Sequence, residues 1–259
     1  RRKLMLEPRG HADMYGGWLG PPVSPGADIS VLFLHNDGFS TMCGHGIIAL
    51  TKVILDMGVL PSIKPETTIT IDTHAGPVTS TATLGDHGVE TVSFLNVPSF
   101  VAGLDQLVDV EDLGQVRYDL AFGGAYYAYV GADSVGLPWP PEQVDRYIDA
   151  GRRIKRAITE TTTIEHPGTP ELGFLYGVIF SGPPMSHWNV RRNVCVFADG
   201  EVDRSPTGTG VSGHLAIDQA RGRMDVGDQI TVESIVGSEF TGSIAGLTTW
   251  EGRQAVIPR

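Results

Sequence analysis

Residues 205–217 read SPTGTGVSGHLAI, and a comparable stretch, TMCGHGIIAL, occupies residues 41–50. Both contain a Gly-x-Gly step that leads into an apolar segment with helical periodicity. Cys43 precedes that step in the first half of the chain, and Thr207 precedes it in the second half. Because a similar loop and helix occurs once in each half, the sequence predicts two related α/β lobes that face a shared cleft.

Short strands dominate the predicted structure. The chain has 33 glycines and 17 prolines, and between them lie short segments rich in Val, Ile, Thr and aromatic residues. The predicted strands are residues 31–35, 68–73, 77–84, 91–97, 116–122, 126–132, 174–181, 193–198, 229–236 and 239–248, and the predicted helices are residues 46–58, 141–160 and 211–222. The first and third helices end at Gly58 and Gly222, which suit a left-handed cap. Charged, loop-like residues near Gly114 predict the change of lobe, which gives lobes of residues 1–114 and 115–259.

The bulk composition is that of an acidic globular protein. The chain has 259 residues, 41% hydrophobic content and a net charge of −11. This negative charge argues against a nucleic-acid binder. The densest basic run, RRIKR at 152–156, lies in a helical pattern and suits a solvated face. Only two cysteines, Cys43 and Cys195, occur, and no apolar run is long enough to span a membrane. We therefore expect a cytoplasmic protein that acts on neither nucleic acid nor membrane. The chain begins RRKLM and stops after a strand-like AVI, so we expect both ends to be trimmed.

The two helix starts are candidate anion sites. Backbone N–H groups at a helix start point outward and carry the positive end of the helix dipole. The amides of Gly44, His45, Gly208 and Thr209 could therefore hold an anion. Each loop taken alone could also be a plain connection into a helix. Neither has the spacing of a nucleotide P-loop or the full dinucleotide fingerprint, so a small carboxylate is the expected ligand.

Cys43 stands where a thiol would feel the dipole of the following helix. A thiol so placed spends more time as the basic thiolate, and His45 could orient a ligand or tune it. The alternative is a buried, inert cysteine. That alternative describes Cys195, which alternates within a strand pattern and has no glycine loop behind it.

Asp203 lies four residues before Thr207, so its carboxylate could reach the ammonium group of a ligand. A turn or capping aspartate is the alternative reading. A metal site built from His11, His35, Cys43 and His45 is not expected, because no pair has the spacing of a zinc finger or of a metalloprotease helix.

Five segments in order resemble the proline racemase family. They are EPRGHADMYG (7–16), LFLHNDGFSTMCGHGIIAL (32–50), YDLAFGGAYYAYV (118–130), FLYGVIF (174–180) and VCVFADGEVDRSPTGTGVSG (194–213). The resemblance implies a diaminopimelate-epimerase-like α+β fold. In that fold, two pseudo-symmetric lobes of strands each wrap around a central helix, and the active site lies in the cleft between them. It also implies that the first lobe here lacks its N-terminal strand and its C-terminal return segment.

The resemblance also implies the chemistry. Racemases and epimerases of the family use two cysteines on opposite faces of the substrate, whereas this chain has Cys43 at the first position and Thr207 at the second. An aliphatic alcohol is a far weaker acid than a thiol, so two-base racemisation should be lost. Threonine at this position is typical of the family's trans-3-hydroxy-L-proline dehydratases. In their substrate the 3-hydroxyl and the α-hydrogen share one ring face, so a single base on that face can serve both.

The resemblance assigns roles by position. Cys43 would remove the α-proton, and Thr207 would mark the second catalytic position. The residues that would bind the substrate are Gly44, His45, Gly208 and Thr209 at its carboxylate, Asp203 with the His45 side chain at its ring nitrogen, and Tyr15 and Phe197 as pocket walls. Plain core packing remains the alternative for the two aromatic residues. We expect no organic cofactor or metal, a small imino acid as substrate, and a homodimer.

Two other functions remain open from the sequence. One is a hydroxyproline epimerase or proline racemase-type isomerase that works with one cysteine and a water molecule. The other is a noncatalytic amino-acid-binding protein. Retention of Cys43 beside an intact glycine loop speaks against the second alternative.

Overall fold

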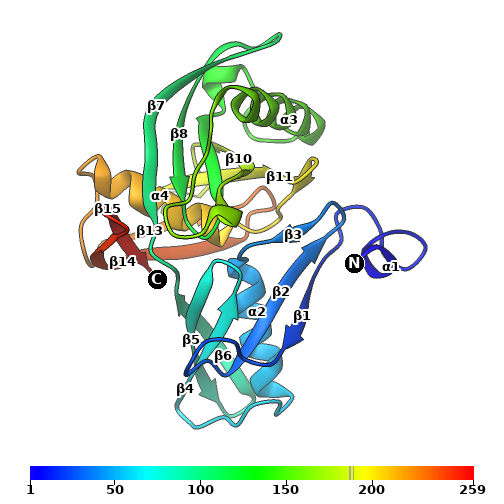
Figure 1. Ribbon diagram of the computed structural model, residues 1–259, viewed down its shortest axis with the longest axis vertical. Helices are drawn as coiled ribbons and strands as arrows, with labels where there is room; N and C mark the ends of the chain where they lie inside the picture. Colours follow the sequence, from blue (N-terminus) through cyan, green and yellow to red (C-terminus); the bar gives the residue numbers. More distant parts are fainter. Residues whose placement is uncertain (187, 189) are drawn as a thin grey trace. The chain divides into compact units, whose positions relative to one another are not determined.

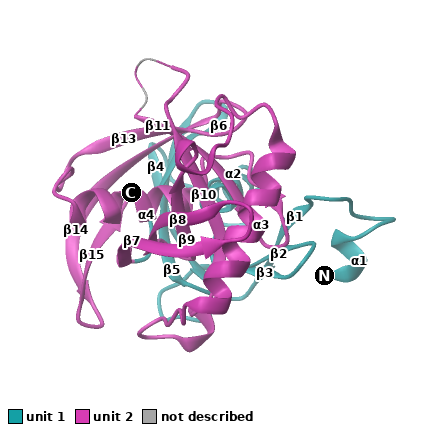
Figure 2. Cartoon of the chain, turned by 90° about the horizontal axis from the view of Figure 1, so that it is seen from above, with its two compact units in different colours: residues 1–97, 259 teal, residues 98–258 magenta. Residues whose placement is uncertain are grey.

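The computed structural model describes residues 1–186, 188 and 190–259. The chain forms two compact units, coloured separately in Figure 2. Unit 1 comprises Arg1–Val97 together with Arg259, and unit 2 comprises Pro98–Pro258. Each unit contains one of the two glycine loops.

Unit 1 is a sheet with one long helix. The strand order is β1-β2-β4-β5-β6, and β3 pairs with β2. Its elements are α1 (Arg2–Met5), β1 (Tyr15–Gly20), β2 (Ile29–His35), β3 (Phe39–Ser40), α2 (Gly44–Asp56), β4 (Glu66–Thr73), β5 (Gly76–Gly85) and β6 (Gly88–Leu95). Helix α2 packs on β5 and β6 (Figure 1). Ile47 and Ile54 lie on its buried face with Thr51, whose hydroxyl bonds Ser80 Oγ at 2.7 Å. This face positions the start of α2.

Unit 2 is a larger sheet with two helices. The strand order is β15-β14-β13-β11-β10-β9-β8-β7, and β12 pairs with β11. Its elements are β7 (Phe100–Val110), β8 (Gly114–Phe122), β9 (Tyr126–Gly131), η1 (Asp133–Val135), α3 (Val144–Thr161), η2 (Pro170–Leu172), β10 (Leu175–Gly182), β11 (Arg191–Phe197), β12 (Glu201–Val202), α4 (Gly208–Ala220), β13 (Gln229–Glu233), β14 (Glu239–Trp250) and β15 (Arg253–Pro258). Helix α4 packs against β7, β8, β14 and β15 (Figure 1). Every residue of α4 from Gly208 to Asp218 is buried. It is the central helix of this unit.

The two units repeat one arrangement of strands around their loops. In unit 1, β3 pairs antiparallel with β2, α2 follows, and β4 returns parallel to β2. In unit 2, β12 pairs antiparallel with β11, α4 follows, and β13 returns parallel to β11. The repeat predicted from two short motifs therefore extends over a whole strand, loop, helix and strand, and the predicted α+β fold is confirmed.

Local signals predicted the helix ends well. Gly58 and Gly222 directly follow the C-cap residues of α2 and α4, and their φ angles are 68° and 67°. This left-handed conformation is the one that glycine adopts without a Cβ penalty.

Strand β7 escaped the sequence prediction. It carries register shifts between Val101 and Gly103 and between Gly103 and Gln106, which break the alternation that marks a strand. The predicted change of lobe near Gly114 falls on the tight turn between β7 and β8, and both strands belong to unit 2. The charged composition there reflects an exposed turn.

Candidate functional site

Cys43 is the N-cap residue of α2. Its backbone is extended, with φ −142° and ψ 112°, and the residue is 7% exposed. Gly44 and His45 form the first turn, where backbone N–H groups point toward the helix start. The Cys43 Sγ lies 3.7 Å from His45 Nε2. The structure thus brings a thiol, an imidazole and two first-turn amides together.

Aromatic side chains surround this helix start. The Tyr15 ring lies 5.9 Å from His45, 6.1 Å from His35 and 6.1 Å from Phe33, measured between ring centroids. Tyr15 was expected as a pocket wall, and it packs beside the predicted binding residue His45. The sequence reasoning did not connect it with Phe33 or His35, because β1 was not predicted as a strand beside β2.

Thr207 is the N-cap residue of α4, and its backbone differs from that of Cys43. Its φ is 67° and its ψ is 93°, which is unusual for a β-branched residue. Its hydroxyl donates to Asp203 Oδ2 at 2.9 Å, and its backbone N–H donates to Ser205 Oγ at 3.1 Å. The Ser205 N–H donates to Asp203 Oδ1 at 2.8 Å. Asp203 therefore holds the loop through both carboxylate oxygens, as a turn aspartate does.

Cys195 lies next to this loop. It is 1% exposed, and its carbonyl accepts the Asp203 N–H at 3.1 Å. Burial and the Asp203 charge raise the pKa of the Cys195 thiol well above its usual range, although a hydrogen bond with the Thr207 side chain lowers it in part. A raised pKa leaves little of the reactive thiolate at neutral pH, which agrees with the expectation that Cys195 is unreactive. Sequence reasoning missed the contact between Cys195 and Thr207. It arises because β12 pairs antiparallel with β11, which returns the chain at Asp203 to a position beside Cys195.

Two tyrosines of β9 hold the first turn of α4. Tyr127 Oη lies 3.0 Å from Thr209 Oγ1, and Tyr129 Oη donates to the Gly210 carbonyl at 3.0 Å. Burial raises the pKa of both phenols well above the usual range, so both remain protonated. Phe197 was expected as a pocket wall, and its ring stacks on that of Tyr176 at 5.4 Å.

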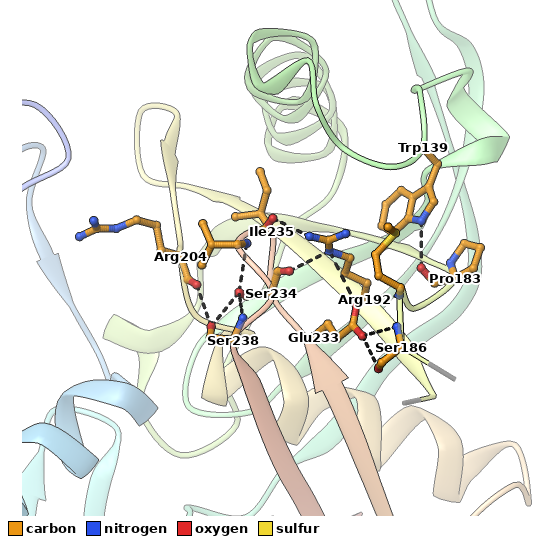
Figure 3. A network of polar contacts seen from close by, with 11 residues as sticks. Trp139, Pro183, Ser186, Arg192, Arg204, Glu233, Ser234, Ile235 and Ser238 are labelled. Carbon is orange, nitrogen blue, oxygen red and sulfur yellow. Dashed lines mark hydrogen bonds and ion pairs between the residues drawn. The ribbon is translucent and has the colours of Figure 1, made fainter. Parts of the chain in front are cut away.

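A second polar network supports the beginning of the loop that contains Thr207 (Figure 3). Ser238 Oγ donates to the Arg204 carbonyl at 3.1 Å. Arg192 Nε donates to the Ser234 carbonyl at 2.8 Å, which fixes the turn that carries Ser238. Glu233 Oε2 accepts the Met185 N–H at 2.8 Å. The Thr207 loop is therefore tied to the β13–β14 turn.

Neither a metal cluster nor a membrane helix is found in residues 1–186, 188 and 190–259. No three His, Cys, Asp or Glu side chains of this described part lie together as metal ligands would, and none of its helices is long and apolar enough to cross a membrane. His11, one of the four residues considered for a metal, is exposed, and its Nδ1 lies 2.6 Å from the Ala12 carbonyl.

Two helices that start from glycine loops, one with Cys43 and the other with Thr207 as its N-cap residue, define a two-lobed α+β protein with a duplicated helix-start site. The chain belongs to the proline racemase family, whose sequence pattern matches residues 1–259.

Named relatives agree with this membership. The chain is 46% identical over 258 residues to a trans-3-hydroxy-L-proline dehydratase of Colwellia psychrerythraea, covering 100% of this chain and 73% of that protein. It is 44% identical over 258 residues to a 3-hydroxyproline 2-epimerase of Burkholderia multivorans, covering 100% and 77%. The crystal structure of a hydroxyproline epimerase from Agrobacterium vitis with bound trans-4-OH-L-proline matches with a TM-score of 0.93 and 37% identity, covering 98% and 73%.

Proposed function

We propose that this chain dehydrates trans-3-hydroxy-L-proline to Δ1-pyrroline-2-carboxylate without a cofactor. The observation that carries the proposal is the residue at the start of α4, where a hydroxyl, that of Thr207, takes the place that corresponds to the Cys43 thiol in unit 1. The dehydratase names of relatives at 46% and 43% identity support it.

Cys43 is the base in this mechanism. Its thiolate removes the α-proton, and the electron pair left on the α-carbon forms a double bond as the 3-hydroxyl departs. The proton gained by Cys43, or one from a group nearby, protonates the leaving hydroxide, because both groups lie on one face of the trans isomer. The enamine product then tautomerises to the imine. His45, 3.7 Å from the sulfur, is placed to stabilise the thiolate.

The substrate carboxylate binds to first-turn amides in this proposal. Gly44 and His45 supply them at α2, and Gly208 and Thr209 supply them at α4. Negative charge spreads onto the carboxylate as the α-proton leaves, and aligned N–H groups stabilise it without reorganisation. Asp203 and the His45 side chain hold the ring nitrogen, with Tyr15 and Phe197 as apolar walls. The proposal requires both loops to act on one bound substrate.

Thr207 leaves no second base at the start of α4. Its hydroxyl donates to the Asp203 carboxylate and titrates far outside the working pH range. The neighbouring thiol of Cys195 does not replace it, since burial and the Asp203 charge raise the pKa of that thiol. No poised donor therefore remains to return a proton to the opposite face of the α-carbon. This favours elimination over epimerisation.

The deciding experiment compares Cys43→Ser with Cys195→Ser as the matched control. We expect Cys43→Ser to fold and to lose pyrroline-carboxylate formation, whereas Cys195→Ser keeps it. A thiol reagent should modify Cys43 faster than Cys195 at neutral pH, and the planar pyrrole-2-carboxylate should protect Cys43. Near wild-type dehydration by Cys43→Ser would refute the proposal.

A hydroxyproline epimerase is the second candidate, because one relative at 44% identity is named a 3-hydroxyproline 2-epimerase. Assays of trans-3-hydroxyproline, trans-4-hydroxyproline and proline in deuterium oxide separate the two functions. Dehydration releases water and forms the cyclic imine, whereas epimerisation changes the optical rotation and incorporates deuterium at the α-carbon.

We further propose that the protein is a cytoplasmic homodimer. The acidic composition, with a net charge of −11, and the small number of cysteines support the location. Analytical ultracentrifugation tests the dimer, and fractionation of the source cells tests the location. A monomer at assay concentrations, or recovery with membranes, would contradict the respective part.

A further inference from the structure

A buried chain of polar side chains lies beneath the start of α4 and ends at the residue before Thr207. Arg191 Nη1 lies 2.8 Å from His214 Nδ1, and His214 Nε2 lies 3.1 Å from Asn193 Oδ1. Asn193 Nδ2 donates to the Pro206 carbonyl at 3.3 Å. His214 and Asn193 are 4% and 1% exposed, so water does not compete for the His214–Asn193 and Asn193–Pro206 bonds.

The direction of every bond in this chain is fixed. The Arg191 guanidinium can only donate, so His214 Nδ1 accepts and the imidazole proton lies on Nε2. That proton is donated to Asn193 Oδ1, which leaves the Asn193 NH₂ group to donate to Pro206. Burial, together with the charges of Arg191 and Arg223, lowers the pKa of His214 well below its usual range, which agrees with a neutral ring.

The charged end of the chain is also anchored. Arg191 Nη2 donates to Asp218 Oδ2 at 2.5 Å, and Arg223 Nη2 lies 2.6 Å from Asp218 Oδ1. Asp218 is 1% exposed and belongs to the same helix as His214. The orientation of Asn193 therefore follows from a chain that starts on α4 itself.

The peptide between Pro206 and Thr207 is held at both ends. Its carbonyl accepts from Asn193 at 3.3 Å, and its N–H donates to Ser205 Oγ at 3.1 Å. The plane of this peptide determines φ of Thr207, which is 67° and unfavourable for a β-branched residue. A flip of the peptide would release Thr207 from that conformation, and it would break both bonds.

We propose that Asn193 is a positioning residue that prevents this flip. Through the Pro206 carbonyl it sets the backbone of Thr207 and the direction of the amides that follow at Gly208 and Thr209. The effect on catalysis rests on the proposed function, because these amides are the proposed carboxylate cradle. The effect on the backbone does not.

The test compares Asn193→Asp with Ser181→Ala. Asp keeps the shape and the Oδ1 acceptor of Asn193 but replaces the donor to Pro206 with an oxygen. Ser181 Oγ lies 3.3 Å from both Asn193 Oδ1 and His214 Nε2, at the acceptor oxygen of Asn193 rather than at the Nδ2 group that donates to Pro206, so Ser181→Ala is the matched control. Asn193→Ala, which buries no charge, is measured in parallel in case Asn193→Asp does not fold.

Two readouts are taken, amide hydrogen exchange by NMR and the kinetics of trans-3-hydroxy-L-proline dehydration. We expect either Asn193 variant to accelerate exchange at Thr207 more than tenfold, with Leu215 in the middle of α4 unchanged, and to lower kcat/KM by about 10- to 100-fold. Ser181→Ala should leave both readouts near wild type.

Equal acceleration at Thr207 and Leu215 would mean general loosening of the unit and would overturn the proposal. Wild-type exchange at Thr207 in both Asn193 variants would overturn it as well. An inactive wild-type chain would instead refute the proposed function, and the exchange comparison would still decide the role of Asn193.

Discussion

Replacement of Gly46 by alanine tests how tightly the Cys43 loop is built. Gly46 is the third residue of α2, and a Cβ there would lie 2.5 Å from Phe33 Cε1 and 3.1 Å from Cys43 Sγ. Phe33 is 2% exposed, so its ring cannot turn into solvent. The new methyl group must therefore displace the ring, the thiol or the helix start.

Two effects of opposite sign decide the outcome for stability. Alanine is favoured over glycine within a helix by up to about 1 kcal/mol, and less in the first turn. Overpacking of a closely packed core costs about 1–3 kcal/mol. Because the contact with Phe33 is far inside the ordinary van der Waals distance, we expect the overpacking cost to lie in the upper part of that range. The net prediction for Gly46→Ala is a loss of about 1–2 kcal/mol in the free energy of unfolding.

Urea denaturation measures this loss, and the dehydration rate reports the displacement of Cys43. The double variant Phe33→Leu/Gly46→Ala is the control, because the smaller side chain makes room for the new methyl group. A double-mutant cycle should show favourable coupling between the two substitutions. A Gly46→Ala protein that is as stable as wild type and fully active would refute the reasoning that the ring and the thiol constrain this position.

Three further substitutions test other parts of the molecule. Tyr129→Phe removes the donor to the buried Gly210 carbonyl, and we expect a loss of about 1–2 kcal/mol in urea denaturation; no change would show that the bond is not needed. Burial would raise the pKa of Asp72, but hydrogen bonds from two backbone N–H groups outweigh the effect of burial and lower the pKa below 3.8. The ionised Asp72 carboxylate therefore stabilises the fold above that pH, and this contribution disappears as the pH falls through the pKa of Asp72 in the folded protein. Asp72→Asn should therefore be less stable than wild type at pH 6, with the gap closing below about pH 4 in thermal unfolding scans, and a gap independent of pH would contradict this. Thr207→Cys should introduce α-carbon epimerisation, detected as deuterium incorporation with inversion; turnover with none would argue against this position as a second base site.

The helix starts and ends could be predicted because their signals are local. A Gly-x-Gly step before an apolar periodic segment marks both helix starts, although the predicted ranges begin two and three residues after Gly44 and Gly208, and Gly58 and Gly222 mark the ends by their conformational freedom. Each signal lies within a few residues of the feature that it predicts, so a single sequence contains it.

The polar support of the loops could not be predicted, because it depends on distant residues. His214 looks like an ordinary residue on an apolar helix, and its bonds to Arg191 and Asn193 exist only when β11 lies against α4. The contact between Cys195 and Thr207 likewise requires the β11–β12 turn. Strand pairing and register bring these side chains together, and neither leaves a short motif.

The repeat of the two units makes one difference between them informative. Cys43 and Thr207 occupy equivalent N-caps, yet Cys43 has an extended backbone and Thr207 has a positive φ. A β-branched residue in that conformation costs about 1–3 kcal/mol, so surrounding bonds must offset the cost. Asp203 on the hydroxyl and Ser205 on the N–H do so within the loop. The hydroxyl thus serves the loop as an internal donor. In the proposed mechanism the same residue supplies no second base, so a single side chain would both hold the backbone that precedes the α4 amides and limit the proton chemistry at that helix start.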